Sequence, residues 1–290
     1  MSKATGGVTE INLRKFDPRT VDPCRCLSVI ARRGSGKSVL IRDIMFHMRN
    51  KIPFGIAVSA TEEGNGAYGE MMPKSFIYDD YTPELIEKFV NRQKYMVTNK
   101  KKNPEAFLIL DDMMADSKKI MKDTNIRFIY LNGRHFKITM ITAAQFSLDS
   151  GGPSIRANID YVFLLRENVV ANQEKLYKHF FGIFPTFNMF QQTLMACTEN
   201  YGMLVLDNTS RSNKIEDCVF WYRAEFHPRV KLCSPAVWKL DKKLYDKNCQ
   251  TVSANVVTNK VSTAQKGRDA KRNATFQVNM SNKSKSIGKK

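Results

Sequence analysis

The feature that most constrains this chain is a short loop with two glycines, placed between an apolar segment and an amphipathic one. Residues 31–38 read Ala-Arg-Arg-Gly-Ser-Gly-Lys-Ser, and apolar side chains recur at helical spacing over residues 37–50. A strand, such a loop and a helix together form a phosphate-binding unit, in which backbone N–H groups and the helix N-terminus surround the phosphates. We therefore predict the strand–loop–helix unit of a P-loop nucleotide-binding protein.

Each residue type in the loop suits this chemistry. Gly34 and Gly36 let the backbone approach the phosphates closely, and Lys37 can reach the β- and γ-phosphates of a triphosphate. The Ser38 hydroxyl can ligate Mg²⁺. The strict pattern has glycine at its first position, where this chain has the small residue Ala31. The nucleotide-binding residues that we predict are Ala31, Arg32, Arg33, Gly34, Ser35, Gly36, Lys37 and Ser38.

Two carboxylates follow a second apolar segment. Residues 107–110 are apolar, and Asp111 and Asp112 come directly after them. In a parallel sheet the carboxyl end of this strand lies beside the phosphate loop, which is the Walker B position. We expect Asp111 to hold Mg²⁺, either directly or through a water ligand, and Asp112 to polarise the attacking water. Glutamate is common as the second acid and Asp112 is one methylene shorter, so Glu62 and Glu63 are alternative bases.

Apolar segments alternate with helical segments along the chain. The strands that we predict are residues 26–31, 54–59, 75–79, 106–110, 137–142, 161–165, 203–206 and 217–222. The predicted helices are residues 37–50, 83–99, 118–131 and 169–181, and residues 180–190 form an aromatic stretch. Fully apolar strands that alternate with helices predict an α/β fold with a mainly parallel sheet covered by helices on both faces.

Composition predicts one large domain with a basic tail. With 290 residues and 42% hydrophobic content, the chain can bury the core of one large α/β domain. The formal net charge is +18, and half of this excess lies in residues 247–290, which contain one aromatic residue and are predicted to be disordered. Such a tail suits a polyanion such as nucleic acid, and the alternative is a solubilising tail. We expect an arm over residues 1–20, the nucleotide-binding domain over 21–245 and the tail over 246–290.

The cysteines and the N-terminus indicate where the chain resides. The six cysteines include no Cys-x-x-Cys pair and no matched histidine spacing, which argues against a zinc site and against a disulfide framework. The first residues lack the apolar core of a signal peptide, and no apolar stretch reaches the length of a membrane span. We therefore expect an intracellular protein without a transmembrane segment.

Two further polar residues lie near predicted strands. Residues 139–144 lead to Gln145, which should lie beside the Walker B strand and could hydrogen-bond the γ-phosphate or the attacking water. The alternative is a glutamine that caps a loop. Arg134 precedes this strand, where an arginine is commonly solvated or caps a helix C-terminus.

Taken in order, these motifs resemble the series found in the FtsK/HerA superfamily of ring-shaped DNA pumps. Within that superfamily, the chain resembles the DNA-packaging ATPases of nucleocytoplasmic large DNA viruses. The matching motifs are residues 31–38, 108–112, 133–135 with 141–145, and 154–158, with further matches at 16–18, 206–210 and 219–222. The resemblance spans residues 14–235.

The resemblance implies a RecA-like P-loop NTPase that uses ATP and Mg²⁺ to thread double-stranded DNA into a capsid. It implies a ring, a hexamer or a pentamer, in which an arginine of one subunit completes the site of its neighbour. Arg134 falls on the position of that arginine, Arg127 is a second candidate, and Gln145 falls on the polar sensor. The implied partners include packaging proteins at a capsid vertex or membrane, and the implied location is the viral factory in the host cytoplasm, with the virion a second site. The predicted catalytic set is Lys37, Asp112, Arg134 and Gln145.

Other functions are compatible with parts of this pattern. A helicase-like motor of the same superfamily, acting in DNA repair or recombination, and a non-catalytic scaffold are the main alternatives. A GTPase would need an Asn-Lys-x-Asp motif, and the most similar run, residues 213–216, ends in Glu216. A kinase would need acceptor-site signatures that the sequence lacks.

Overall fold

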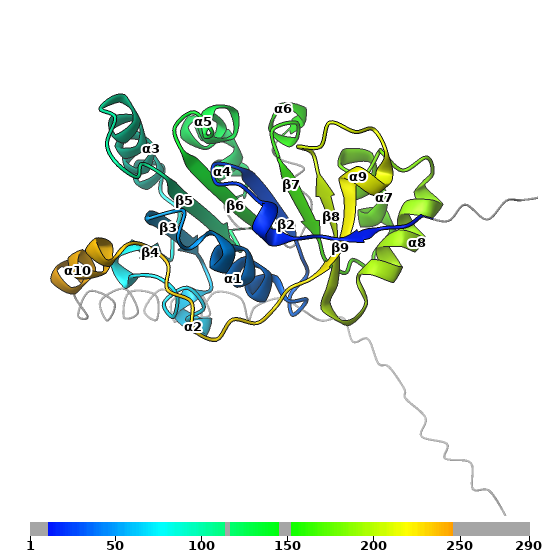
Figure 1. The fold of residues 1–290 in the computed structure, drawn as a ribbon, viewed down its shortest axis with the longest axis horizontal. Coiled ribbons are helices and arrows are strands. Elements are labelled where there is room, and N and C mark those ends of the chain that lie inside the picture. Colours follow the sequence, from blue (N-terminus) through cyan, green and yellow to red (C-terminus); the bar gives the residue numbers. More distant parts are fainter. Residues whose placement is uncertain (1–10, 114–116, 145–151, 246–290) are drawn as a thin grey trace, which may run out of the picture. The chain divides into compact units, whose positions relative to one another are not determined.

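The computed structural model describes residues 11–113, 117–144 and 152–245. Within these residues, nine strands form one sheet in the order β1-β9-β8-β7-β2-β6-β5-β3-β4 (Figure 1). The strands are β1 Arg14–Lys15, β2 Cys26–Ile30, β3 Phe54–Ser59, β4 Ile77–Tyr78, β5 Ala106–Asp111, β6 Ile138–Ala144, β7 Tyr161–Leu164, β8 Gly202–Asp207 and β9 Val219–Arg223. The predicted tail, residues 246–290, lies outside the described residues.

The six strands from β7 to β4 run parallel. In the register of the sheet, Ile30 of β2 pairs with Ala144 of β6, and Asp111 of β5 pairs with Ala143 of β6. The carboxyl ends of β2, β6 and β5 therefore meet at one edge of the sheet. The predicted mainly parallel α/β sheet is confirmed, and β6 does lie beside the Walker B strand.

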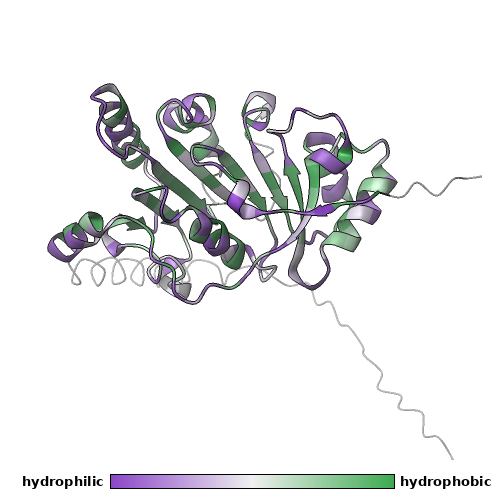
Figure 2. Ribbon diagram, viewed as in Figure 1, coloured by the Kyte–Doolittle hydropathy of each residue, from purple (hydrophilic) through white to green (hydrophobic). Residues whose placement is uncertain are grey.

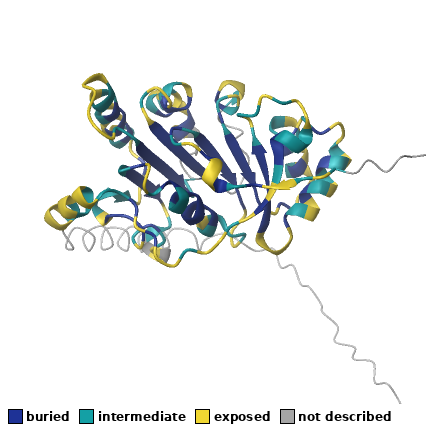
Figure 3. Cartoon of the chain, viewed as in Figure 1, coloured by how far each residue is buried: buried dark blue, intermediate teal, exposed yellow. Residues whose placement is uncertain are grey.

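Alternating side chains from each central strand enter two separate hydrophobic cores. Along β2, Cys26 and Ile30 belong to one core, and Leu27 and Val29 belong to the other. This alternation follows from the two-residue period of a strand. Because both faces are covered, the central strands are mostly apolar and buried at nearly every position (Figures 2 and 3).

Helices cover both faces of the sheet, as predicted (Figure 1). Helix α1 packs on one face, and α3, α5, α7 and α8 contribute side chains to the core on the other. The helices are α1 Lys37–Met48, α2 Glu62–Asn65, α3 Pro83–Thr98, α4 Ser117–Lys122, α5 Thr124–Asn132, α6 Gly152–Arg156, α7 Val170–His179, α8 Phe187–Cys197, α9 Ile215–Cys218 and α10 Pro235–Leu244. None of the helices in the described part of the chain is long and apolar enough to span a membrane.

The parallel order ends at β7. Strand β8 is antiparallel to both β7 and β9, and the short N-terminal strand β1 pairs parallel with β9 at the edge. Strands β8 and β9 therefore extend the sheet beyond β7, with β8 starting and β9 ending at the carboxyl edge of the parallel strands. This arrangement brings residues from the second half of the chain close to the phosphate loop.

Three predicted elements differ from the structure. The helix predicted over residues 118–131 is two helices, because Asp123 has extended backbone angles and its carboxylate caps α5 by accepting the N–H of Asn125 at 2.7 Å. The strand predicted over residues 217–222 begins as the helical turn α9, and β9 starts at Val219. The strand predicted over residues 75–79 is reduced to β4, because residues 74–76 form a 3-10 turn. Helix α8, which begins near the end of the aromatic stretch and which Thr186 caps by accepting the N–H of Met189 at 3.3 Å, was not predicted.

Candidate active site

The loop between β2 and α1 makes a tight turn that depends on two glycines. Gly34 and Gly36 have φ angles of +76° and +101°, in the left-handed region that favours glycine. Gly36 is the N-cap of α1, and its carbonyl accepts the N–H of Leu40 at 3.0 Å. The Ser35 hydroxyl donates to the carbonyl of Arg32 at 2.6 Å and closes the turn. The loop therefore leads straight into the N-terminus of α1, where backbone N–H groups favour an anion.

Ala31 and Ser38, at the two ends of the loop, have different surroundings. Ala31 is buried in the core beneath α1, so its methyl group occupies core volume instead of the ligand side of the loop. Ser38 is exposed in the first turn of α1 and lines the cavity described below. Packing thus accommodates the alanine at the usual glycine position.

Lys37, Asp111 and Asp112 form one ion cluster at the carboxyl edge of the sheet. Lys37 Nζ lies 2.7 Å from Asp111 Oδ1 and 3.4 Å from Asp112 Oδ1. Asp111 is the last residue of β5, and only 3% of its surface is exposed. The next residue, Asp112, has a φ angle of +58° and donates its N–H to the carbonyl of Ala143. Positive φ is uncommon outside glycine and such residues cluster at functional sites. Folding thus brings the predicted lysine and both predicted acids together.

A buried tyrosine holds the second oxygen of Asp111. The Tyr68 hydroxyl donates to Asp111 Oδ2 at 2.8 Å. Burial, and then the Asp111 charge, raise the pKa of Tyr68 well above its ordinary value, so the hydroxyl keeps its proton and remains a donor. Glu62, an alternative base, accepts the N–H groups of Tyr68 and Gly69 at 3.0 and 2.7 Å and so holds this loop in place. The side chain of Glu63 lies outside the described residues.

A cavity of about 1110 Å³ is lined by this cluster. The lining combines the phosphate loop and start of α1, the segments after β3 and β5, and residues next to β8 and β9. The lining residues are Arg32, Arg33, Gly34, Gly36, Lys37, Ser38, Val39, Ala60, Thr61, Gly64, Asp111, Asp112, Asn200, Tyr201, Met203, Arg223 and Ala224. Its volume of about 1110 Å³ is slightly above the range of about 300–1,000 Å³ that is usual for small-molecule sites.

Three lining residues come from regions that sequence patterns did not connect with the loop. Asn200 and Tyr201, just before β8, have φ angles of +49° and +62°. Tyr201 is 68% exposed, and its Cδ1 lies 3.6 Å from where a Cβ on Gly36 would be. Arg223, at the end of β9, adds a cation to the cavity wall. An exposed aromatic ring and a positive charge from outside the loop therefore flank the loop.

Arg134 lies at the opposite edge of the sheet. Its Nη2 donates to Asp160 Oδ1 at 2.9 Å, and Arg25 donates to the same oxygen at 3.1 Å. Residues 25 and 160 directly precede β2 and β7, and residue 134 shortly precedes β6, so this ion cluster is at the amino ends of parallel strands. The phosphate loop is at the carboxyl ends, and the fold therefore does not bring Arg134 to Lys37 of the same subunit. Arg127 is exposed on α5.

Gln145 lies outside the described residues. The strand before it, β6, ends at Ala144 between β2 and β5. Gln145, the predicted sensor, therefore directly follows in sequence the strand that lies between β2, which leads to the phosphate loop, and β5, which leads to the two acids.

The oxygen atoms near Lys37 suit Mg²⁺. This ion prefers hard oxygen ligands and usually binds through one or two carboxylates, waters and substrate phosphates. The Ser38 hydroxyl and the carboxylates of Asp111 and Asp112 all line the same cavity. The donor set therefore fits the ion that the loop motif predicts.

The fold and the cavity define a class, the P-loop NTPase fold. The genome packaging NTPase B204 of Sulfolobus turreted icosahedral virus 2, in complex with AMPPCP, has a TM-score of 0.52, 15% identity, and coverage of 71% of this chain and 100% of that one. B204 of Sulfolobus turreted icosahedral virus, a DNA-packaging ATPase, has a TM-score of 0.52, 16% identity and the same coverage. At these identities the similarity establishes the fold.

Comparison with related sequences identifies the protein family of the chain. Uncharacterized protein L437 of Acanthamoeba polyphaga mimivirus is 34% identical over 225 residues, which cover 74% of this chain and 78% of the relative. Uncharacterized protein 075L of Invertebrate iridescent virus 6 is 36% identical over 230 residues, covering 76% and 86%. No family model matches the chain. The chain belongs to this family of proteins of nucleocytoplasmic large DNA viruses, the virus group that the motifs indicated.

Proposed function

We propose that the chain hydrolyses ATP at the cavity beside the phosphate loop. The observation that carries this proposal is the ion cluster of Lys37 with Asp111 and Asp112 at the carboxyl edge of the sheet. In this cluster the Lys37 ammonium contacts both carboxylates, and all three groups would face the phosphates of a bound nucleotide. The loop N–H groups would bind the triphosphate, and Lys37 would exchange its carboxylate partners for the β- and γ-phosphates.

Other residues in and near the cavity would bind Mg²⁺, activate the water and bind the base. Ser38 and Asp111 would hold Mg²⁺, which supplies charge neutralisation at the transferring phosphoryl group. Tyr68 keeps Asp111 oriented through its second oxygen. Asp112 would accept the proton of the attacking water, and Gln145 would orient that water or the γ-phosphate. Tyr201 offers an exposed ring on which a nucleotide base could stack.

Asp112→Asn is expected to bind ATP and Mg²⁺ but to hydrolyse ATP at least about 10²-fold more slowly, because general-base catalysis contributes about 10²–10⁴-fold. Asparagine keeps the size of the side chain and removes the basic oxygen. Steady-state hydrolysis and nucleotide binding are measured in parallel, with the exposed Asp80→Asn as the matched control. An unchanged rate would move the base to another acid, and Glu62→Gln would then be the next variant.

The hydrolysis would drive movement along double-stranded DNA during genome packaging. Three observations support this step: the family consists of proteins of large DNA viruses, the fold is that of a viral genome packaging NTPase, and the net charge is +18. The chain would act as a ring, hexameric or pentameric, together with packaging proteins at a capsid vertex or membrane in the viral factory. Its domain would extend over residues 21–245, the predicted bounds, together with the strand β1 that pairs with β9.

A repair or recombination helicase of the same superfamily is the alternative, and the DNA substrate separates the two. A packaging pump is expected to hydrolyse ATP faster on blunt duplex DNA, whereas a helicase favours duplex DNA with single-stranded ends. Hydrolysis rates are compared on the same duplex with blunt ends and with single-stranded extensions, at equal nucleotide concentration. A preference for the extended substrate would favour the helicase.

Truncation after Asp246 is expected to weaken duplex binding regardless of DNA sequence and to flatten its salt dependence. The deleted residues 247–290 carry half of the net positive charge of the chain. Each lost phosphate contact changes the slope of log K against log salt by about 0.9. The slope is measured by filter binding, and a full-length chain with the tail lysines and arginines changed to glutamine separates charge from length. An unaltered slope would assign the tail a role other than DNA binding.

A further inference from the structure

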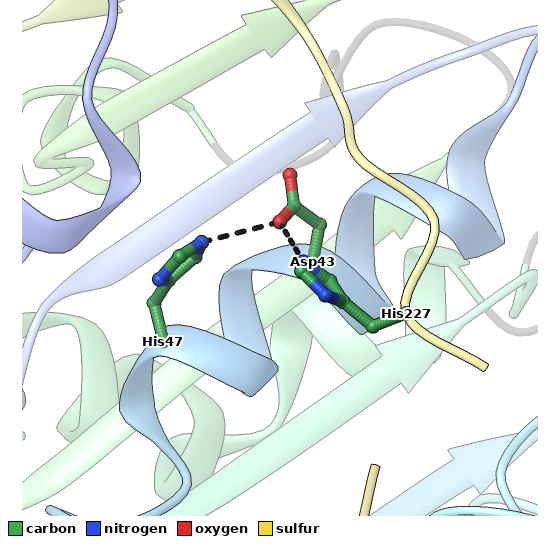
Figure 4. Close-up of side chains that lie close together, drawn as sticks. All are labelled: Asp43, His47 and His227. Carbon is green, nitrogen blue, oxygen red and sulfur yellow. Dashed lines mark hydrogen bonds and ion pairs between the residues drawn. The ribbon is translucent and has the colours of Figure 1, made fainter. Parts of the chain in front are cut away.

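A cluster of two histidines and one aspartate lies away from the phosphate loop, on α1 (Figure 4). Asp43 and His47 are one helical turn apart, and His227 comes from the segment after β9. Asp43 Oδ1 lies 2.8 Å from His227 Nε2 and 3.3 Å from His47 Nε2. One ligand atom from each residue can be chosen so that all three lie within 4.8 Å of one another. The arrangement therefore gathers two nitrogens and one oxygen at one point.

The surrounding contacts orient Asp43 and His227. The other oxygen of Asp43 accepts the Tyr222 hydroxyl and, at 3.1 Å, the N–H of Glu225, which leaves Oδ1 for the two imidazoles. The His227 ring stacks on Phe46 with a centroid distance of 3.8 Å and an interplanar angle of 8°. Such hydrogen bonds and packing around the ligands are typical of metal sites, where they fix the direction of each ligand.

The donor types select one class of ion, and the distances from Asp43 are compatible with it. In a tetrahedral zinc site with bond lengths of about 2.0–2.1 Å, neighbouring ligand atoms are about 3.3 Å apart. The Asp43–His47 distance already has this value, and the Asp43–His227 distance needs to open by about 0.5 Å. Imidazole nitrogens suit zinc and other divalent transition metals, whereas Mg²⁺ and Ca²⁺ prefer oxygen ligands. The histidine side chains are 19% and 17% exposed, which allows an ion to enter.

We propose that Asp43, His47 and His227 bind one divalent transition-metal ion, with Zn²⁺ as the ion that fits best. The ion fastens the segment after β9 to α1. This connection matters to the cavity, because α1 begins at Lys37 and the segment begins beside the cavity residues Arg223 and Ala224. The site is distinct from the predicted Mg²⁺ ligands and does not depend on the proposed hydrolysis.

Titration of the metal-free full chain with Zn²⁺, without nucleotide, tests the site. We expect one Zn²⁺ per chain by calorimetry and a higher Tm in its presence. His227→Gln keeps a hydrogen-bond donor near Asp43 but changes a ligand, and we expect it to raise the Kd more than about 10²-fold, because even changes around the ligands cost about 10–100-fold. His135→Gln, at an exposed histidine outside the cluster, should bind like the wild type.

Three further measurements keep the result unambiguous. Asp111→Asn should leave Zn²⁺ binding unchanged, which separates this site from the nucleotide site. Co²⁺ in place of Zn²⁺ should give a tetrahedral visible spectrum without a sulfur charge-transfer band, because the ligands include no cysteine. His47→Gln is a second ligand variant in case His227→Gln does not fold by circular dichroism. No Zn²⁺ binding by the wild type, or wild-type affinity in a folded ligand variant, would reduce the cluster to a hydrogen-bonded contact.

Discussion

Replacing Lys37 with alanine is expected to reduce ATP hydrolysis by at least about 10³-fold, because it removes the charge that neutralises the γ-phosphate during transfer. The same substitution leaves the buried Asp111 carboxylate without its cation at 2.7 Å. Breaking a buried ion pair on one side costs about 3–5 kcal/mol of stability, so stability is measured together with turnover.

Lys37→Arg separates the two effects. Arginine keeps a positive charge beside the acids, but its planar guanidinium does not reproduce the compact ammonium, so we expect a stable chain with strongly reduced hydrolysis. Lys51→Ala, an exposed lysine just beyond the other end of α1, is the matched control and should hydrolyse ATP normally. Normal turnover in a folded Lys37→Ala chain would remove the phosphate loop from the mechanism.

Arg134→Ala is expected to bind ATP but to lose about 10³-fold or more in turnover, the contribution of an arginine that stabilises the transferring phosphoryl group. Arg134 lies at the edge of the sheet opposite its own phosphate loop, so any contact with a γ-phosphate would be in a neighbouring subunit. Its side chain is 64% exposed, and loss of such an ion pair has little effect on stability.

Mixed assemblies test the shared site directly. Arg134→Ala subunits mixed with Lys37→Ala subunits should regain activity, because an intact loop then faces an intact arginine. Asp160→Asn is the control, since it breaks the Arg134–Asp160 ion pair, retains an oxygen for the N–H of Cys26 and leaves the guanidinium in place. Full activity of Arg134→Ala, or failure of rescue in assemblies shown to be mixed, would exclude this role and make Arg127→Ala the next variant.

Local patterns were sufficient for the centre of the fold. The phosphate loop, the apolar strands and the Asp111–Asp112 pair each lie in one short segment, and parallel pairing brings the ends of such segments to the same edge. This is why Lys37 and the two acids could be placed together before the structure was known. The division of the predicted helix 118–131 at Asp123 was not predicted, because apolar residues recur at helical spacing on both sides of this N-cap residue.

The remaining contacts depend on segments that meet only after folding. Tyr68 reaches Asp111 from a glycine-rich stretch that has the composition of a surface loop. Tyr201 and Arg223 reach the cavity because β8 runs antiparallel to β7 and β9 runs antiparallel to β8, so β8 starts and β9 ends at the carboxyl edge, an arrangement that strand periodicity alone does not specify. In the same way His227 meets Asp43 and His47 across 180 or more residues of chain, and cysteine and histidine spacing gave no sign of it.

The most direct test of ATP-driven movement along duplex DNA is displacement of a third strand from a blunt-ended duplex. A protein that travels along intact duplex DNA removes a triplex-forming strand in its path without separating the two duplex strands. We expect the wild-type chain to release the labelled third strand only with ATP and Mg²⁺, with the duplex intact, and Lys37→Arg to release none. ATP hydrolysis without release of the third strand, or release accompanied by separation of the duplex, would contradict a duplex translocase.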